Sequence, residues 1–450
     1  PTNLYQMTEA NYQIVQSPYH GDGIIATKPL QCNDVVFSET PLFFLQSLPN
    51  RQLALVCSHC SRFLGSTGLQ MKYLQKEITR QDLSEAGMKK EGFKEYFPLS
   101  EVVPCVLNCG ELYCSSLCQQ QHWCEKGHCL LCTGQIQEDQ MEENALYQLK
   151  VFAVQSNEIF LMISDIIAEY ITKHDPSFTP ATSSSSEPRP DSLAVFQHYV
   201  RNVWWEAISL PKVPTKRKQL QKTLQNLVNG LWEHLNSTFQ LKDRGLAGVF
   251  SKEWIARTIG MFEQNNVGVR VENPILTFIK QVDIHQQPEI VEEIFQEVIK
   301  IRDSIEDEGE CYHDDDDDED DEDEMEEGEG ENEDEDMAVE DVEGNDTLNS
   351  EENSLLEPYQ RRWAELQRII TEVGEDSLFP PLDGTAFFIL TCKINHSCDP
   401  NVRVNYHIHP TKGLELKMLT IKDIGAGEEL LQSYIDQFQD KKERQKALKD

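Results

Sequence analysis

Eight residues in the first third of the chain have the types and spacing of metal ligands. They form four close pairs: Cys57 and Cys60, Cys105 and Cys109, Cys114 and Cys118, and His128 and Cys132. Two such residues can hold an ion from one turn of chain, and structural zinc takes four ligands, so the eight predict two zinc sites. The economical arrangement is interleaved, with the first and third pairs on one ion and the second and fourth on the other. The alternative ligands are His122, Cys124 and Cys129.

The distribution of the 13 cysteines favours metal binding over disulfides. Most lie in tight clusters beside a histidine, which is typical of metal sites in a reducing compartment. Buried or adventitious thiols are the weaker alternative. Because the cysteines indicate a reducing compartment, we expect the protein in the nucleus and the cytoplasm.

A second set of chemistry-bearing residues is spread over strings that are distant in sequence. Asn395–Asn401 reads Asn-His-Ser-Cys-Asp-Pro-Asn, residue types that could simply form a turn. However, Gly384–Phe388 precedes it and Gly427–Tyr434 follows it, while Gly21–Gly23 lies near the start of the chain. Glycines allow a backbone to approach a ligand closely. A lone Gly-x-Gly is a weak signal, and here it counts only together with the other strings.

The four strings resemble a SET domain, and the cysteine segment resembles a MYND zinc finger. A SET domain split by a MYND finger is the plan of the SMYD lysine methyltransferases. Ile259–Asn266 resembles a segment of the fifth SMYD member and of its plant trithorax-related counterpart. The resemblance extends from about Tyr19 to Leu448. It departs from the usual finger in the spacing of Cys105 and Cys109 and in a 44-residue insertion after Cys60, which we interpret as a loop.

The resemblance implies an α+β fold in which a β-rich SET core is split by a two-zinc MYND finger and a helical insert. The expected segments are residues 1–56 (N-terminal SET part), 57–132 (finger), 133–302 (helical insert with a Ser/Pro loop at 179–190), 303–353 (acidic disordered insert) and 354–450 (C-terminal catalytic part).

The same resemblance implies a protein-lysine N-methyltransferase that uses S-adenosyl-L-methionine. Tyr434 matches the catalytic phenol of the family, the alternative being a strand-end aromatic packed in the core. The matched cofactor residues are Gly21, Asp22, Gly23, Asn265, Asn395, His396 and Tyr434. Asn266 is the alternative to Asn265 for the cofactor contact. The alternative role of Asn265 is to cap the end of a helix. We expect the reaction to depend mainly on placement and desolvation of the lysine amine.

A protein-interaction module is the alternative function. In that case the MYND finger binds proline-containing peptides, and the SET scaffold is inactive. Family members continue into a post-SET cysteine cluster that binds a third zinc with a cysteine matching Cys398. The sequence ends at Asp450 without that cluster, so either the chain is a fragment or the site is unfinished.

The net charge of −38 comes mainly from one segment. Thirty of the 78 acidic residues and no Lys or Arg lie between Asp303 and Glu352, so the other 400 residues carry only −8. A chain-wide basic footprint for nucleic acid is excluded, and no stretch has the length and apolarity of a membrane helix. The acidic segment is expected to be disordered, either as a solubilising loop or as an arm for basic partners such as histones or ribosomal proteins.

Periodicity predicts the elements that position these residues. Apolar residues recur at helical spacing between Glu142 and Arg302, including a helix over Pro288–Arg302, and again over Pro358–Val373. The segment up to Leu45 and the segment Gly384–Tyr434 have the alternation and turns of strands.

Overall fold

The computed structural model describes residues 10–17, 21–86, 96–175, 192–310, 350–435 and 443–444. It forms two compact units, one of Pro1–Thr277 with Pro380–Asp450 and one of Phe278–Phe379. The predicted Ser/Pro loop at 179–190 lies outside the described residues. So does the part of the predicted acidic insert from 311 to 349.

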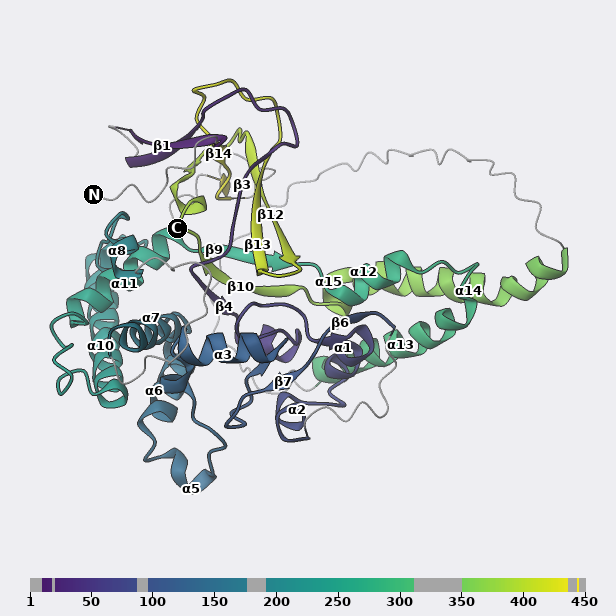
Figure 1. The fold of residues 1–450 in the computed structure, drawn as a ribbon, viewed down its shortest axis with the longest axis horizontal. Helices are drawn as coiled ribbons and strands as arrows, with labels where there is room; N and C mark the ends of the chain where they lie inside the picture. Colours follow the sequence, from purple (N-terminus) through teal and green to yellow (C-terminus); the bar gives the residue numbers. More distant parts are fainter. Residues whose placement is uncertain are drawn as a thin grey trace. The chain divides into compact units, whose positions relative to one another are not determined.

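The sheets of the first unit join strands from both ends of the chain (Figure 1). N-terminal β3 pairs with C-terminal β13, which also pairs with β12, and N-terminal β4 pairs with β10. Short β11 and β14 pair in parallel, and β1 pairs with β2. The bounds are β1 Tyr12–Ser17, β2 Gly21–Ala26, β3 Val35–Glu39, β4 Phe43–Gln46, β10 Leu382–Phe387, β11 Asn395–His396, β12 Val402–His409, β13 Gly413–Thr420 and β14 Leu431–Gln432.

One strand interrupts the segment predicted to be helical. β9 (Val267–Val271) pairs with β10, with Leu382 opposite Val271. Val269 and Val271 point into the core, while Gly268 and Arg270 are exposed. The prediction of helical structure between Glu142 and Arg302 is therefore wrong over these five residues, which form a strand.

A buried asparagine joins the two sequence-distant parts of the core. Asn50, in η1 (Asn50–Gln52), donates from Nδ2 to the Pro381 carbonyl at 2.7 Å. Its Oδ1 accepts from the Asp383 N–H at 3.0 Å and from the Gln46 amide at 2.9 Å. A buried side chain that satisfies three polar groups at once fixes the strand ends beside it.

The finger carries more structure than the sequence predicted. Its elements are β5 Gly65–Ser66, α1 Thr67–Leu74, α2 Arg80–Ala86, β6 Pro98–Ser100, β7 Val103–Pro104, β8 Leu112–Tyr113, α3 Ser116–Cys124 and α4 His128–Leu131. The insertion between Cys60 and Cys105, interpreted as a loop, contains α1 and α2. The Ser66 hydroxyl caps α1, and the buried Gln70 amide donates to the carbonyls of Leu55 and Leu64. The insertion therefore packs onto the finger.

Besides the apolar core of the strands, the first unit has another apolar core that is surrounded by helices, as predicted. Figure 1 shows α6, α7, α10 and α11 gathered together. Isoleucines and phenylalanines of α7 and α11 and leucines of α10 meet in this core. The bounds are α5 Glu138–Met141, α6 Ala145–Ser156, α7 Ile159–His174, α8 Ser192–Phe196, α9 Trp204–Ala207, α10 Pro214–Phe239 and α11 Lys252–Asn265. No helix in the described part of the chain is long and apolar enough to span a membrane.

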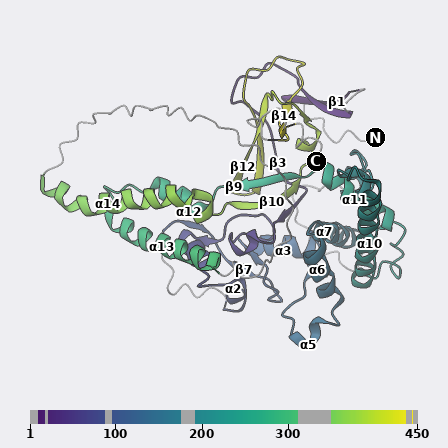
Figure 2. The ribbon, with the colours of Figure 1, turned by 180° about the vertical axis from the view of Figure 1, so that it is seen from behind.

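The second unit is built on two helices that lie side by side in both views (Figures 1 and 2). They are α13 (Pro288–Glu310) and α14 (Ser350–Val373), with α15 (Glu375–Leu378) and the end of α12 (Pro274–Gln281) beside them. Both helices exceed their predicted bounds. α13 continues into the acidic segment, and α14 begins before Pro358, which lies exposed inside the helix instead of starting it.

Candidate functional site

Folding brings the glycines of β2 against the Asn-His string of β11. The Asn395 amide donates to Glu429 Oε1 at 2.7 Å. A Cβ atom on Gly23 would lie 2.8 Å from that same oxygen and 3.1 Å from the Asn395 nitrogen, so these two side chains would have to shift to make room for it. Gly21 has a φ of +75°, which favours glycine. The close contact of β2 with Asn395 and Glu429 therefore favours glycine at position 23.

Tyr434 lies beside the same string. Its hydroxyl donates to the Ile394 carbonyl at 2.6 Å, and its N–H donates to His396 Nδ1 at 3.0 Å. The side chain is 56% exposed, so Tyr434 is not packed in the core. The phenol is thus oriented by its hydrogen bond to the residue before β11, and the Tyr434 backbone is held by His396 of β11.

The two candidate asparagines at the end of α11 have different environments. The Asn265 amide donates back into its own helix, to the Met261 carbonyl at 2.8 Å. Asn266 Oδ1 is buried and has no hydrogen-bond partner among the described residues. Buried polar atoms are normally hydrogen-bonded, so Asn266 is the amide with an unused acceptor.

Two charged side chains position this site but were not singled out in the sequence. Glu39, at the end of β3, accepts hydrogen bonds from the N–H groups of Leu390 and Thr391 at 2.9 and 2.7 Å and from the Thr391 hydroxyl at 2.6 Å. Burial raises the pKa of Glu39 despite these bonds. Lys393, in η3 (Thr391–Lys393), pairs with Asp22 at 2.6 Å. In the sequence, Lys393 could have been noticed as a charged residue within a largely apolar run.

Cys398 joins no candidate ligand group of three or more among the residues that the structure describes. Its sulfur lies 3.5 Å from His396 Nε2 and is exposed.

The eight finger ligands gather into the two interleaved groups. One contains Cys57, Cys60, Cys114 and Cys118, and the other contains Cys105, Cys109, His128 and Cys132, with the ligand atoms of each group within 4.8 Å of one another. Sulfur atoms lie 3.5 Å apart between Cys60 and Cys114, near the roughly 3.8 Å expected for tetrahedral zinc–thiolate bonds. The donor sets fit structural zinc.

The alternative ligands stand outside both groups. His122 Nδ1 bonds the Tyr113 hydroxyl at 2.9 Å, and its ring stacks on His128 with centroids 4.8 Å apart. Cys124 and Cys129 are likewise not members of either group.

A half-buried carboxylate links the two ligand groups. Glu111, between Cys109 and Cys114 in sequence, accepts from the Ser58 hydroxyl at 2.5 Å and from Arg51 at 2.9 Å. Burial alone would raise the pKa of Glu111, but the charges of Arg51 and Arg80 hold it well below its usual value. Ser58 follows Cys57, so this contact ties the first ligand pair to the chain between the second and third pairs.

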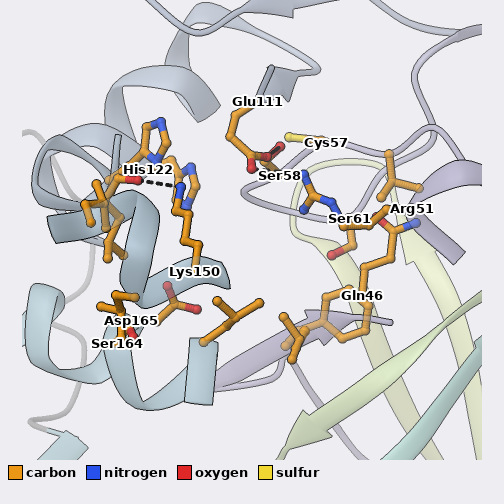
Figure 3. A pocket seen from close by; sticks show the side chains of 18 residues that line it. Gln46, Arg51, Cys57, Ser58, Ser61, Glu111, His122, Lys150, Ser164 and Asp165 are labelled. Carbon is orange, nitrogen blue, oxygen red and sulfur yellow. Dashed lines mark hydrogen bonds and ion pairs between the residues drawn. The ribbon is translucent and has the colours of Figure 1, made fainter. Parts of the chain in front are cut away.

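A cavity of about 150 Å³ lies where the finger meets β4, α6 and α7. Figure 3 shows Asp165 and Lys150 on one side of it and Arg51 and Ser61 on the other. Lys150 donates to the Leu131 carbonyl at 2.9 Å, and the Asp165 carboxylate has no hydrogen bond or ion pair with the described residues. Burial raises the pKa of Asp165 to about 7, although Lys126 and Lys150 oppose the shift.

Asp165→Asn should change how stability depends on pH. The pKa of this carboxyl is raised from 3.8 to about 7 on folding, so the folded state binds more protons between these values. The wild-type free energy of unfolding should therefore fall as pH rises through this window, relative to that of the variant. Above pH 7 the variant should be more stable by at most about 4 kcal/mol. Urea denaturation at several pH values measures the difference, and a constant difference from pH 4 to 8 would contradict the shift.

Comparison with known proteins places this chain in a family. The SET domain model matches residues 21–435. The histone-lysine N-methyltransferase ATXR2 of Arabidopsis thaliana is 24% identical over 484 aligned positions, covering 96% of this chain and 86% of that protein. The N-lysine methyltransferase SMYD2-B of Xenopus laevis is 40% identical over 67 residues, or 15% of this chain and 14% of that protein. The histone-lysine N-methyltransferase set5 of Schizosaccharomyces pombe is 39% identical over 61 residues, or 14% and 18%.

The predicted resemblance to SMYD proteins and their plant trithorax-related counterpart is confirmed. The predicted enzyme class, protein-lysine methyltransferase, is confirmed with it, and the interaction-module alternative is not favoured. With its glycine strand, Asn-His string and tyrosine brought together inside the matched region, the chain belongs to the SET domain family.

Proposed function

We propose that this chain transfers a methyl group from S-adenosyl-L-methionine to a lysine side chain of a basic protein. The observation that carries the proposal is the convergence of three sequence-distant strings: Gly23 lies against Asn395, and the Tyr434 N–H bonds His396. This convergence lies inside the region that matches the SET domain. The names of the relatives, which are histone-lysine and protein-lysine methyltransferases, support the same reaction.

The cofactor would lie against β2 and β11. Gly21, Asp22 and Gly23 supply close backbone, and Asn395 and His396 supply polar contacts. The geometry favours Asn266 over Asn265 for the contact from α11, because the Asn265 amide is already bonded within its helix while Asn266 Oδ1 is unused. When bound, S-adenosyl-L-methionine supplies the methyl group.

Tyr434 would orient the lysine amine. Its O–H already donates to the Ile394 carbonyl, so the lone pairs of the phenol oxygen remain free to accept an N–H from the amine. A lysine amine with a pKa of about 10.4 is protonated at neutral pH, and only its neutral form is a nucleophile. Holding the neutral amine in line with the methyl group is the placement task that the phenol performs.

The finger would bind two zinc ions, one in each ligand group. Structural zinc stabilises small domains directly, and these groups hold together a finger whose own apolar core is small. Proline-containing peptides are a further candidate ligand of the finger.

The substrate would be a histone or a ribosomal protein, and the protein would act in the nucleus and the cytoplasm. Histone-lysine methyltransferase relatives support the nuclear assignment. The acidic residues between Asp303 and Glu352 would attract a basic substrate, an effect that salt should weaken.

Asn266→Ala should weaken cofactor binding by about tenfold, since it removes an unpaired buried acceptor available to the ligand. Asn265→Ala is the matched control on the neighbouring residue and should leave affinity within about twofold. Calorimetric titration with S-adenosyl-L-methionine compares the two. A larger loss of affinity in Asn265→Ala than in Asn266→Ala would assign the contact to Asn265 instead.

Tyr434→Phe removes only the hydroxyl, so the fold and zinc content should be unchanged. The rate of methyl transfer should fall more than about tenfold, because the phenol acts on the reacting amine. Cofactor affinity should change far less, as expected for a contact made with the reacting group. Radiolabelled methyl transfer onto histones and ribosomal proteins measures the rate. Unchanged turnover would make Tyr434 a structural residue.

The folded protein should contain two zinc ions per chain, and His128→Ala should lose one of them. His122→Ala provides the control, because His122 lies beside His128 but outside both groups, and it should keep two. Elemental analysis of freshly purified protein measures the ratio. Equal zinc loss in the two variants would overturn the ligand assignment.

A further inference from the structure

Lys393 is a buried lysine at the point where the strings of the site meet. It is 8% exposed. Its ammonium group bonds Asp22 Oδ2 at 2.6 Å and lies 4.4 Å from the ring centroid of Tyr199. Burying an ammonium group is costly unless an opposite charge compensates it, so this lysine depends on its partners.

The position of the ion pair relates it to the site. Asp22 lies between Gly21 and Gly23 of β2, and Lys393 lies two residues before Asn395. The pair therefore joins β2 to the short segment that carries the Asn-His string. At this same junction Gly23 comes so close to Asn395 and Glu429 that a Cβ atom would displace their side chains.

The aromatic partner of Lys393 is itself fixed. The Tyr199 hydroxyl donates to the Ile389 carbonyl at 2.5 Å, and its ring meets Phe387 edge-on at 4.9 Å. A cation over an aromatic face is attracted by the ring, and more strongly when both are desolvated. Lys393 is thus held from two directions, by the N-terminal strand and by a ring anchored near the end of β10.

The residue after Lys393 also supports the tyrosine of the site. The Ile394 carbonyl accepts the Tyr434 hydroxyl at 2.6 Å. A shift of Lys393 would consequently move the acceptor of Tyr434 as well as the start of β11.

We propose that Lys393 is a positioning residue for the cofactor site. Its ion pair with Asp22 holds β2 at the spacing from β11 that the cofactor requires, and cofactor affinity depends on the pair instead of on either charge alone. This inference rests on the proposed function, because it concerns the S-adenosyl-L-methionine site of that reaction.

Calorimetric titration with S-adenosyl-L-methionine tests the pair in a double-mutant cycle. Lys393→Met and Asp22→Asn should each weaken binding by about tenfold or more, as misplacement at a site does. The double variant should be no weaker than the single variants, because both changes break one interaction. Lys393→Arg keeps the charge and should restore binding to within about threefold of wild type.

Two further measurements separate positioning from general damage. Zinc content and cooperative melting should be retained in all four variants. Lys412→Met removes another lysine paired with a buried carboxylate, Glu415 at 2.8 Å, and should leave cofactor affinity unchanged. Should Lys393→Met fail to fold, weak binding by Asp22→Asn together with rescue by Lys393→Arg would still support the pair.

Three outcomes would overturn the proposal. Wild-type-like affinity of Lys393→Met and Asp22→Asn would show that the pair does not set the site. If the double variant lost affinity by the product of the two single-variant losses, Lys393 and Asp22 would act separately, for example with Lys393 contacting the cofactor directly. A wild-type protein that does not bind S-adenosyl-L-methionine would remove the proposed function itself, and the inference with it.

Discussion

The first unit depends on strand pairing between the two ends of the chain. β3 pairs with β13 and β4 pairs with β10, although hundreds of residues separate the partners. Closing such long loops costs conformational entropy, which the shared apolar core of these strands must offset. The finger and the helices leave from and return to these strands. The site therefore exists only when both ends have met.

Buried and half-buried ionisable side chains fix the details of this closure. Glu39 holds the chain before η3, Glu111 ties the two ligand groups together, and Lys393 joins β2 to β11. Each has an opposite charge or several hydrogen-bond donors beside it, which is the condition under which buried charges are tolerated. Asp165 differs: Glu169, one turn further along α7, takes the ammonium groups of Lys126 and Lys173. The Asp165 carboxylate is therefore left facing the cavity.

Several features of the chain could be predicted because they depend on local spacing. Pairs such as Cys57 and Cys60 indicate metal ligands from a few residues, and the alternation around Leu416 indicates a strand. The errors have physical reasons. β9 was missed inside a helical region because its pairing with β10 supplies the partner that decides its conformation. The finger insertion, predicted as a loop, forms helices because they gain stability from packing on the finger core.

By itself the sequence determined the ligand pairs, the glycine and Asn-His strings, the tyrosine and the concentration of acidic charge, since each is a property of residue type and spacing. Tertiary structure decided which residues face one another. It distinguished Asn265 from Asn266 through a hydrogen bond within α11, and it placed Lys393 against Asp22, a contact between residues at opposite ends of the chain. Such contacts are set by packing and by the satisfaction of buried polar groups in the folded state, and neither is encoded in local spacing.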